Sequence, residues 1–473
     1  MKVLFASSEA YPFAMSGGLA DVSGALPKAL RKRFVGCRVV MPLYGCVSEE
    51  MRKNMNFLCS ITVPVSWRRQ YCGIFEAHVD GVIYYLLDNQ YYFKRDGLYG
   101  HYDDAERFAF FSRAVLEIIP HIDFKPDVIH CNDWQTALVP VYLNAFYRWD
   151  EKFKNIKTVF TIHNIQYQGK YGHELTSDVL GLPPECESLL DYDGCINFMK
   201  GAIQCADKVT TVSPTYAREI LDPYYSHGLD GILREFTFKL TGIVNGIDYD
   251  VYNPETDGLI YRGYNADDMA GKAFNKQSLQ SELGLPEKPG VPVIGIVSRL
   301  VKHKGFDLVK CVFEELLRAD LQFAILGSGE WELETFFHRM AERYPDKVGL
   351  KLGFNPQLAH RIYAGADMFL MPSQSEPCGL AQMVALRYGT VPIVRETGGL
   401  NDTISDSGDG QGNGFTFQSY NAHDMENAVW RALAGYSDAN GWDTLKKRGM
   451  ECDNSWSRSA NAYIKLYKEI VNG

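Results

Sequence analysis

The chain lacks the features that mark several large protein classes. It has no run of 18 apolar residues that could cross a membrane, and only residues 3–6 separate Lys2 from Ser7, which is too short for the apolar part of a secretory signal. The eleven cysteines are an odd number and include no C-x-x-C pair, so neither a disulfide framework nor a zinc spacing is visible. These absences predict a reduced, cytoplasmic protein with no membrane partner.

Positive charge is also in short supply. The 473 residues include 48 Lys and Arg against 58 Asp and Glu, which gives a formal net charge of −10 at pH 7. A general nucleic-acid binder needs many cations facing phosphates, so no nucleic-acid partner is expected. An anionic ligand would bind only where cations are concentrated locally. Because 46% of the residues are hydrophobic, the chain can bury a large core, and its length suits two or three domains.

Short apolar runs alternate with amphipathic stretches along most of the chain. The runs lie at 2–7, 37–42, 82–88, 127–131, 158–163 and 208–213, and then at 291–298, 321–327, 347–353, 367–373 and 391–396. This alternation predicts βαβ units, and therefore an α/β fold with two doubly wound, mostly parallel sheets.

The segment from about 245 to 292 is rich in Gly, Asn, Asp and Pro, which predicts a linker with little regular structure. We therefore expect one domain at 1–245 and a second at 246–454. An amphipathic helix is expected at 455–473. It either caps the second domain or, as we prefer, packs back on the first.

Two glycine pairs follow apolar runs and precede helical patterns. They are Gly17-Gly18 in MSGGLADV and Gly398-Gly399 in ETGGLNDT. A tight turn is the simpler interpretation of each pair. The functional interpretation is a close approach of the backbone to a sugar or phosphate at a helix N-terminus.

Four basic residues crowd the carboxyl end of the first strand expected in the second domain, in SRLVKHKGFD. They are Arg299, Lys302, His303 and Lys304. Open α/β sheets bind ligands at such strand ends. The loop is therefore either a solvated basic loop or a clamp for a diphosphate.

The segment SEPCGLAQMVAL (375–386) predicts a helix that begins at Pro377. Such a start would leave the amides around Cys378 to Leu380 able to bind an anion or hydroxyls. Glu376 either only favours the helix dipole or binds substrate. Because no His lies near it in the sequence, Cys378 is expected to be a buried structural thiol rather than a nucleophile.

His163 and Asp133 each end an expected strand of the first domain, in FTIHNIQYQG and HCNDWQT. A histidine in this place is either a hydrogen-bonded structural residue or a catalytic one. His130, Cys131 and Asp133 resemble metal ligands, but adjacent strand residues point to opposite faces and cannot converge on one ion. No metal site is expected.

In combination, these motifs resemble the bacterial glycogen synthases, which are similar to plant starch synthases. The resemblance spans nearly the whole chain and is carried by SSEAYPF, SGGLADVSGALP, HCNDWQTAL, TIHNIQYQG, VSPTYARE, GIVNGID, SRLVKHKGFD, LGSGE, SEPCGLAQM and RETGGLNDT. It implies two Rossmann-like domains that face each other across a cleft (the GT-B type), with the C-terminal helix returning to the first. It also implies metal-independent, retaining transfer of glucose from ADP-glucose to the non-reducing 4-hydroxyl of an α-1,4-glucan, without a cofactor.

The resemblance further implies roles for single residues. Arg299 and Lys304 would bind the donor diphosphate and stabilise the leaving nucleotide, while Glu376 and His163 would contact the donor glucose. Asp133 would lie on the reacting side, with Glu9 and Asn245 nearby. The other donor-binding positions implied are Met15, Gly17, Gly18, Phe354 (stacked on adenine), Cys378, Gly379, Leu380 and Thr397.

One position departs from the family pattern. The first glycine loop of the family usually begins with Lys, as K-T-G-G-L, whereas this chain has Met15, and Glu396 stands at the equivalent place in the second loop. A cation near the diphosphate is therefore missing. Two alternatives stay open: a UDP-sugar transferase acting on a small acceptor, and a catalytically weak glucan-binding relative.

Overall fold

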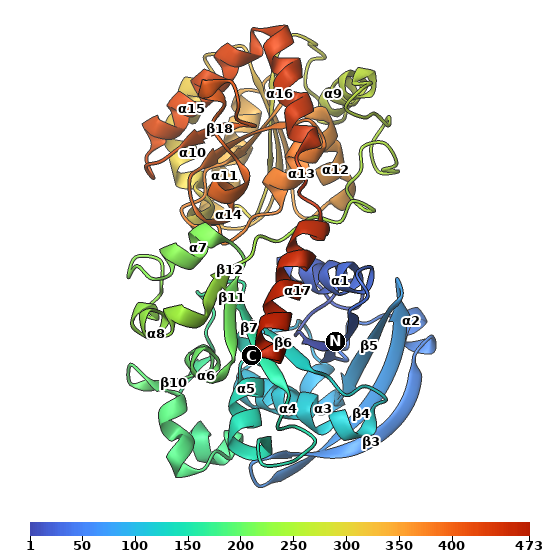
Figure 1. Cartoon of the computed structure of the whole chain (residues 1–473). Coiled ribbons are helices and arrows are strands. Elements are labelled where there is room, and N and C mark those ends of the chain that lie inside the picture. The colour runs from blue at the N-terminus through green and yellow to red at the C-terminus, as the bar shows by residue number, and fades with distance from the viewer. The chain divides into compact units, whose positions relative to one another are not determined.

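The computed structural model describes all 473 residues, which form two compact units. Unit 1 comprises residues 1–245 and 456–473, and unit 2 comprises residues 246–455. Each unit is built on a largely parallel sheet flanked by helices (Figure 1). The alternation of apolar runs and amphipathic stretches therefore predicts the doubly wound α/β class of both units correctly.

The sheet of unit 1 has nine strands in the order β12-β11-β7-β6-β1-β2-β5-β4-β3. Their bounds are β1 (Lys2–Ala6), β2 (Gly36–Pro42), β3 (Asn56–Val65), β4 (Arg68–Val79), β5 (Val82–Asp88), β6 (Val128–Asn132), β7 (Lys157–Ile162), β11 (Lys208–Thr211) and β12 (Leu240–Gly242). The order of the strands reverses between β1 and β6. The carboxyl ends of these two strands flank the position where open α/β sheets bind ligands.

The edge of this sheet was not predicted. β3 and β4 form a long antiparallel hairpin, and β4 also pairs antiparallel with β5. Only one face of the hairpin is buried, so its apolar residues alternate with exposed ones and form no continuous apolar run. A small separate sheet of β8 (Lys170–Tyr171), β9 (Asp191–Tyr192) and β10 (Cys195–Asn197) was missed because its strands are so short.

The C-terminal helix belongs to unit 1, where it packs beside the first helix (Figure 1). The Tyr467 hydroxyl lies 2.7 Å from His130 Nδ1 on β6, and Arg33 Nε donates a hydrogen bond to Asn461 Oδ1 at 2.8 Å. The helices of unit 1 are α1 (Gly18–Arg31), α2 (Glu49–Lys53), α3 (Gln90–Phe93), α4 (Asp104–Glu117), α5 (Leu138–Tyr142), α6 (Phe198–Cys205), α7 (Pro214–Glu219), α8 (Asp230–Glu235) and α17 (Trp456–Asn472).

His130 makes the stability of unit 1 depend on pH. The imidazole is fully buried between Tyr467 and Thr161, and burial lowers its pKa to about 3, so it is neutral in the folded protein. In the unfolded chain a histidine titrates near pH 6.5, so protons bound below that pH stabilise only the unfolded state. Stability is expected to fall by about 1.4 kcal/mol between pH 7.5 and pH 5.5 from this group.

The variant His130→Gln is expected to lose about 1.4 kcal/mol less than the wild type over this pH interval, because glutamine does not titrate. Urea unfolding at pH 7.5 and 5.5 measures the difference. The matched control is Tyr467→Phe, which removes the hydrogen bond to His130 but keeps the buried histidine, so it should keep the wild-type pH dependence. An equal loss in His130→Gln and the wild type would contradict the prediction.

The sheet of unit 2 has six strands, all parallel, in the order β15-β14-β13-β16-β17-β18. Their bounds are β13 (Val293–Val297), β14 (Gln322–Gly327), β15 (Val348–Leu352), β16 (Met368–Met371), β17 (Val391–Arg395) and β18 (Phe415–Phe417). Here the strand order reverses between β13 and β16, so the ligand position of this sheet lies beyond the ends of those two strands.

Helices cover both faces of this sheet. The larger core lies under α10, α11 and α15, and the smaller one under α9 and α12. The helices of unit 2 are α9 (Ala270–Glu282), α10 (Phe306–Leu316), α11 (Trp331–Arg343), α12 (Pro356–Gly365), α13 (Ala381–Arg387), α14 (Gly398–Thr403), α15 (Ala422–Tyr436) and α16 (Ala439–Glu451).

The expectation of an irregular linker at 245–292 is wrong for α9, which is a regular helix of 13 residues. Its buried face is largely polar, so it has no apolar periodicity to read. Lys272 Nζ donates to the Tyr388 carbonyl at 2.9 Å and to Thr390 Oγ1 at 2.7 Å, and Lys276 Nζ lies 2.7 Å from Asp367 Oδ2. Hydrogen bonds satisfy these buried amino groups and so allow a helix without an apolar stripe.

Two further findings concern membrane-spanning helices and disulfides. No helix is both long enough and apolar enough to span a bilayer. All eleven cysteines are free thiols.

Candidate functional site

The sheet of unit 1 brings three predicted residues to one edge. Glu9 follows β1, Asp133 follows β6 and His163 follows β7, and these three strands are parallel neighbours. Their carboxyl ends therefore meet at the reversal of strand order. The fold places together residues that are up to 154 positions apart in the chain.

Asp133 and Asn132 hold His163 in place, and Asn132 was not among the residues predicted from the sequence. Its backbone N–H donates to Asp133 Oδ1 at 2.8 Å, and its Nε2 lies 2.9 Å from Asn132 Oδ1. The Asn132 amide nitrogen donates to the Ala6 and His130 carbonyls, which leaves Oδ1 as an acceptor. His163 Nε2 must therefore carry the proton, and Nδ1 keeps a lone pair. Burial lowers the pKa of His163 to about 3, so this neutral tautomer persists at working pH.

Asp133 has a strained backbone conformation and a carboxyl group with a raised pKa. Its φ is +56°, in the left-handed region that non-glycine residues rarely occupy. Its carboxylate accepts the N–H groups of His163 and, at 3.4 Å, of Asn164. Burial, reinforced by the charge of Glu9, raises the pKa of Asp133 to about 7. A group poised in this way at a strand end is typical of functional sites.

Glu9 anchors the first glycine loop. Its buried carboxylate accepts the Ser16 backbone N–H, and the Ser16 hydroxyl donates to it at 3.1 Å. Burial raises the pKa of Glu9 even though these hydrogen bonds lower it. The sequence offered Glu9 only through the family resemblance, and Ser16 was missed altogether.

The first glycine pair opens α1, whose first residue is Gly18 and whose N-cap is Gly17. Gly17 has an extended backbone that any residue can adopt, and a Cβ built on it would meet no atom within 4 Å. Met15 beside it is half-exposed. Neither the backbone conformation nor the packing requires glycine at position 17. The tight-turn interpretation therefore does not explain why a glycine is present there.

The sheet of unit 2 forms a second cluster at its own reversal of strand order. Lys304, beyond β13, places its Nζ 2.6 Å from Oε2 of Glu376, beyond β16. The Ser373 hydroxyl donates to the same oxygen at 2.9 Å. Glu376 is buried, and both of these contacts fall on its Oε2. Ser373 was missed, although its place at the end of the apolar run 367–373 could have identified it.

Arg299 lies in the same basic loop but is exposed, and its guanidinium makes no hydrogen bond or ion pair to the protein. Burial, followed by the charges of Lys304 and Arg299, lowers the pKa of His303. Positive potential is therefore concentrated at this strand end, as an acidic protein requires for binding an anion.

The second glycine pair packs against the loop that carries Glu376. A Cβ at Gly398 would overlap the Glu376 carbonyl oxygen, and one at Gly399 would overlap the Cys378 carbonyl oxygen. Gly398 also has a φ of +45°. Here, unlike at Gly17, glycine is needed by the protein, because only glycine lets the two backbones approach this closely.

The expected helix start at Pro377 is wrong: α13 begins at Ala381. Gly379 has a φ of +70°, which interrupts a helix, and Gln382 Nε2 donates to the Cys378 and Gly379 carbonyls at 3.1 and 3.0 Å. Residues 377–380 are therefore a loop fixed by a side chain rather than a first turn. Cys378 is buried, and Leu380 is the N-cap of α13.

The remaining predicted residues are scattered around these clusters. Phe354 follows β15 and is 83% exposed, so its ring face is open to a ligand. Thr397 is buried and is the N-cap of α14. Asn245 is buried, and its Oδ1 has no hydrogen-bond partner. No group of three or more His, Cys, Asp or Glu side chains in the chain is arranged to hold a metal ion.

Comparison with known proteins gives matches over the whole length. A family model described as the starch synthase catalytic domain matches residues 2–235, and the model for glycosyl transferases group 1 matches residues 277–447. The glycogen synthase of Geobacillus thermodenitrificans (strain NG80-2) is 52% identical over 100% of this chain and 98% of its own. That of Bacillus anthracis is 53% identical over 100% of both chains.

Two solved structures are similar to the chain. The catalytic domain of starch synthase IV from Arabidopsis thaliana, bound to ADP and acarbose, has a TM-score of 0.93 and 35% identity, with 100% of this chain and 99% of that one covered. Sucrose-phosphate synthase from Thermosynechococcus elongatus has a TM-score of 0.61 and 17% identity over 100% and 99% of the two chains, which shows a shared fold alone.

Proposed function

We propose that this chain, which belongs to the glycogen synthase family of glycosyltransferases, transfers glucose from ADP-glucose to the non-reducing 4-hydroxyl of an α-1,4-glucan with retention of configuration. The observation that carries the proposal is the cluster beyond β13 and β16, where Lys304 is held against Glu376 and the Arg299 guanidinium has no partner in the protein. The starch synthase relative bound ADP, which supports an adenine nucleotide as the donor.

In this proposal Arg299 and Lys304 act on the leaving group. The bond between the glucose C1 and the diphosphate oxygen breaks, and negative charge develops on the departing ADP. A planar guanidinium and an ammonium that are already in place stabilise this charge without reorganisation. The new bond forms between C1 and the acceptor oxygen, and the acceptor proton passes to the departing phosphate oxygen. The proposed reaction uses no side-chain base, metal or cofactor.

Each unit offers an acceptor for sugar hydroxyls. On unit 1, His163 offers the Nδ1 lone pair that its bond to Asn132 leaves free. On unit 2, Glu376 offers the carboxylate oxygen that Lys304 and Ser373 do not contact. Both atoms suit sugar hydroxyls, which donate hydrogen bonds. Asp133, Gly17 and Gly18 on unit 1, and Phe354, Thr397 and residues 378–380 on unit 2, are proposed as further contacts to the substrates. The free thiols suit a reducing compartment, and we place the protein in the cytoplasm.

Nucleotide release tests the proposal. The purified chain is given ADP-, UDP-, GDP- or CDP-glucose with a glycogen primer, and release of ADP above the other three nucleotides is expected. Faster release of UDP, with a small acceptor in place of glycogen, would support a UDP-sugar transferase instead. Binding to glycogen without release of any nucleotide would support a glucan-binding protein without activity.

Met15→Lys is expected to lower the KM for ADP-glucose about 1.4- to fivefold, because an exposed charge pair is worth roughly 0.2–1 kcal/mol. Met15 is half-exposed before the N-terminus of α1, so a lysine fits there without repacking. Initial rates over a range of ADP-glucose concentrations measure the change. Met15→Gln, which has similar length and no charge, is the control. An unchanged or higher KM in Met15→Lys would show that the missing cation does not limit donor binding.

A further inference from the structure

Phe34, in the turn between α1 and β2, combines an unfavourable backbone conformation with almost complete exposure. Its φ is +62°, and its side chain is 98% exposed. The Phe34 N–H donates to the Arg31 carbonyl at 3.0 Å, and the Val35 N–H donates to the Leu30 carbonyl at 3.2 Å. These two bonds form a Schellman motif, in which residue 34 takes the left-handed position that glycine usually occupies after a helix. A phenylalanine there strains the backbone and leaves a large apolar ring in water, so neither the backbone nor the packing of unit 1 accounts for it.

The end of α1 is tied to the C-terminal helix. The helices α1 and α17 pack side by side (Figure 1), and Arg33 Nε donates to Asn461 Oδ1 on α17 at 2.8 Å. Arg33 directly precedes Phe34. This bond therefore brings the turn that carries Phe34 to the surface formed by α17.

The exposed side of α17 is a stripe of cations. The buried residues of this helix recur every three or four positions, so the opposite side faces solvent. Arg458, Asn461, Lys465 and Lys468 follow one another on that side at intervals of three, four and three residues, and all four are exposed. Because Arg33 is bonded to Asn461 within this stripe, the cations of α17 and the turn at Phe34 share one surface.

This surface has a local excess of positive charge. We call it the basic patch, and it consists of Phe34 with the cations Arg31, Arg33, Arg458, Lys465 and Lys468. On α17 only Glu469 carries a negative charge, and the side chains of Arg31, Arg458, Lys465 and Lys468 form no ion pair in the protein. In a chain whose net charge is −10, such a concentration of cations attracts an anionic partner.

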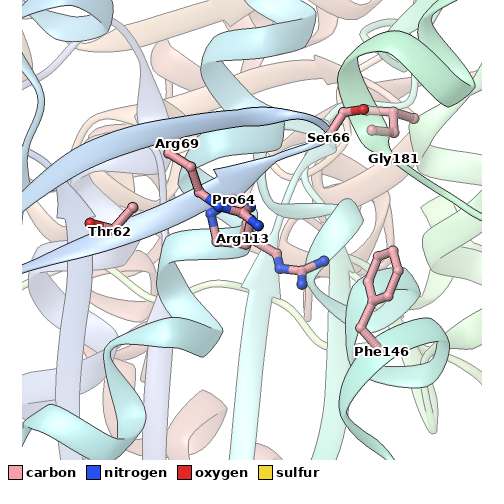
Figure 2. Close-up of a pocket in the computed structure, with 8 residues that line it drawn as sticks. Thr62, Pro64, Ser66, Arg69, Arg113, Phe146 and Gly181 are labelled. Atoms are coloured by element: carbon pink, nitrogen blue, oxygen red, sulfur yellow. The ribbon is translucent and has the colours of Figure 1, made fainter.

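The basic patch is convex, because it consists of the outer side of a helix and an exposed turn. The cavity of about 510 Å³ in the same unit lies elsewhere, beside the β3–β4 hairpin, and is lined in part by Pro64, Arg69 and Phe146 (Figure 2). A small anion is better bound in an enclosed site, whereas an extended anionic surface can meet cations that are spread over two helices. A bilayer of anionic lipids offers phosphates to the cations and an apolar boundary to one exposed aromatic ring.

We propose that the basic patch binds unit 1 to a surface of anionic lipids, with Phe34 inserted at the boundary between headgroups and acyl chains and the cations against the phosphates. The absence of a membrane-spanning helix concerns crossing of a bilayer and does not bear on binding to its surface. The patch contains no residue of the proposed transfer reaction, so this proposal does not depend on the proposed function.

Co-sedimentation of the full chain with lipid vesicles tests the proposal. Vesicles of phosphatidylglycerol mixed with phosphatidylcholine should bind the wild type, and vesicles of phosphatidylcholine alone should not, because they carry no net negative charge. Binding should weaken when the salt concentration is raised from about 0.1 M to about 1 M, because screening shortens the reach of the cations.

Phe34→Gly should weaken binding about 10- to 100-fold, because the inserted ring is lost. The same substitution should raise the melting temperature of unit 1 by about 1–4 °C, since glycine suits the left-handed position. A loss of binding together with a gain in stability cannot result from misfolding. Lys465→Gln should weaken binding about fivefold. The matched controls are Phe238→Ala and Arg318→Gln, at side chains that are 77% and 76% exposed outside the patch, and both should bind as the wild type does.

The proposal is wrong if the wild type does not bind vesicles that contain phosphatidylglycerol, or if it binds vesicles of phosphatidylcholine alone equally well. It is also wrong if Phe34→Gly binds as tightly as the wild type. Binding to polyglutamate that Phe34→Gly abolishes, without binding to vesicles, would assign the basic patch to an acidic protein partner and would overturn the lipid proposal as well.

Discussion

Lys304→Ala is expected to lower kcat for glucosyl transfer by roughly 10²- to 10³-fold, which is the usual cost of removing one preorganised group that stabilises developing negative charge. Lys304 is fixed before any ligand binds, because its Nζ lies 2.6 Å from a Glu376 oxygen that Ser373 also holds. The charge on the departing diphosphate is larger in the transition state than in the bound donor. The loss should therefore appear mainly in kcat rather than in the KM for ADP-glucose.

Lys302→Ala is the matched control for this prediction. Lys302 belongs to the same basic loop, but its side chain is exposed and its backbone N–H, which donates to Glu330 Oε1 at 3.1 Å, survives the substitution. It should retain kcat within about twofold, as is usual for an exposed charge. Initial rates of ADP release on a glycogen primer measure both variants. A Lys304→Ala protein with near wild-type kcat would remove Lys304 from the proposed mechanism.

Gly398→Ala is expected to lower kcat about 100-fold, because a displacement of about 1 Å at reacting groups has costs of this size. The new Cβ would overlap the Glu376 carbonyl oxygen, and the φ of +45° at this position disfavours any side chain. The loop that holds Glu376 against Lys304 would have to move. Because both effects also strain the fold, the melting temperature of unit 2 should fall as well.

Gly17→Ala tests whether the first glycine loop differs from the second in what requires its glycine. Its Cβ meets no atom of the protein and its backbone is extended, so the melting temperature should not change. Any effect of Gly17→Ala should appear as a higher KM for the donor, because only a ligand would meet the added methyl group. Wild-type kcat and melting temperature in Gly398→Ala would contradict the contact described between residue 398 and the Glu376 loop.

Local sequence patterns predicted strands correctly where a strand is buried along nearly its whole length. β1 in unit 1, and β13 and β16 in unit 2, are short buried strands that consist almost entirely of apolar residues. β6 and β7 are also buried along nearly their whole length, although they include a few polar residues. The β3–β4 hairpin was not predicted, because buried and exposed residues alternate along its strands. The helix α9 was not predicted, because its buried face contains lysines rather than an apolar stripe. The start of α13 was misplaced, because Gln382 and the left-handed Gly379 fix the preceding loop through contacts that a proline rule does not include.

The α/β class, the family and the strand ends that carry Glu376, Lys304, Asp133 and His163 can all be predicted from short motifs in the sequence. Two contacts of the site cannot. Lys304 meets Glu376, 72 residues away, and Asn132 sets the tautomer of His163. These contacts depend on the order of strands in a sheet and on side-chain packing, which local composition does not encode.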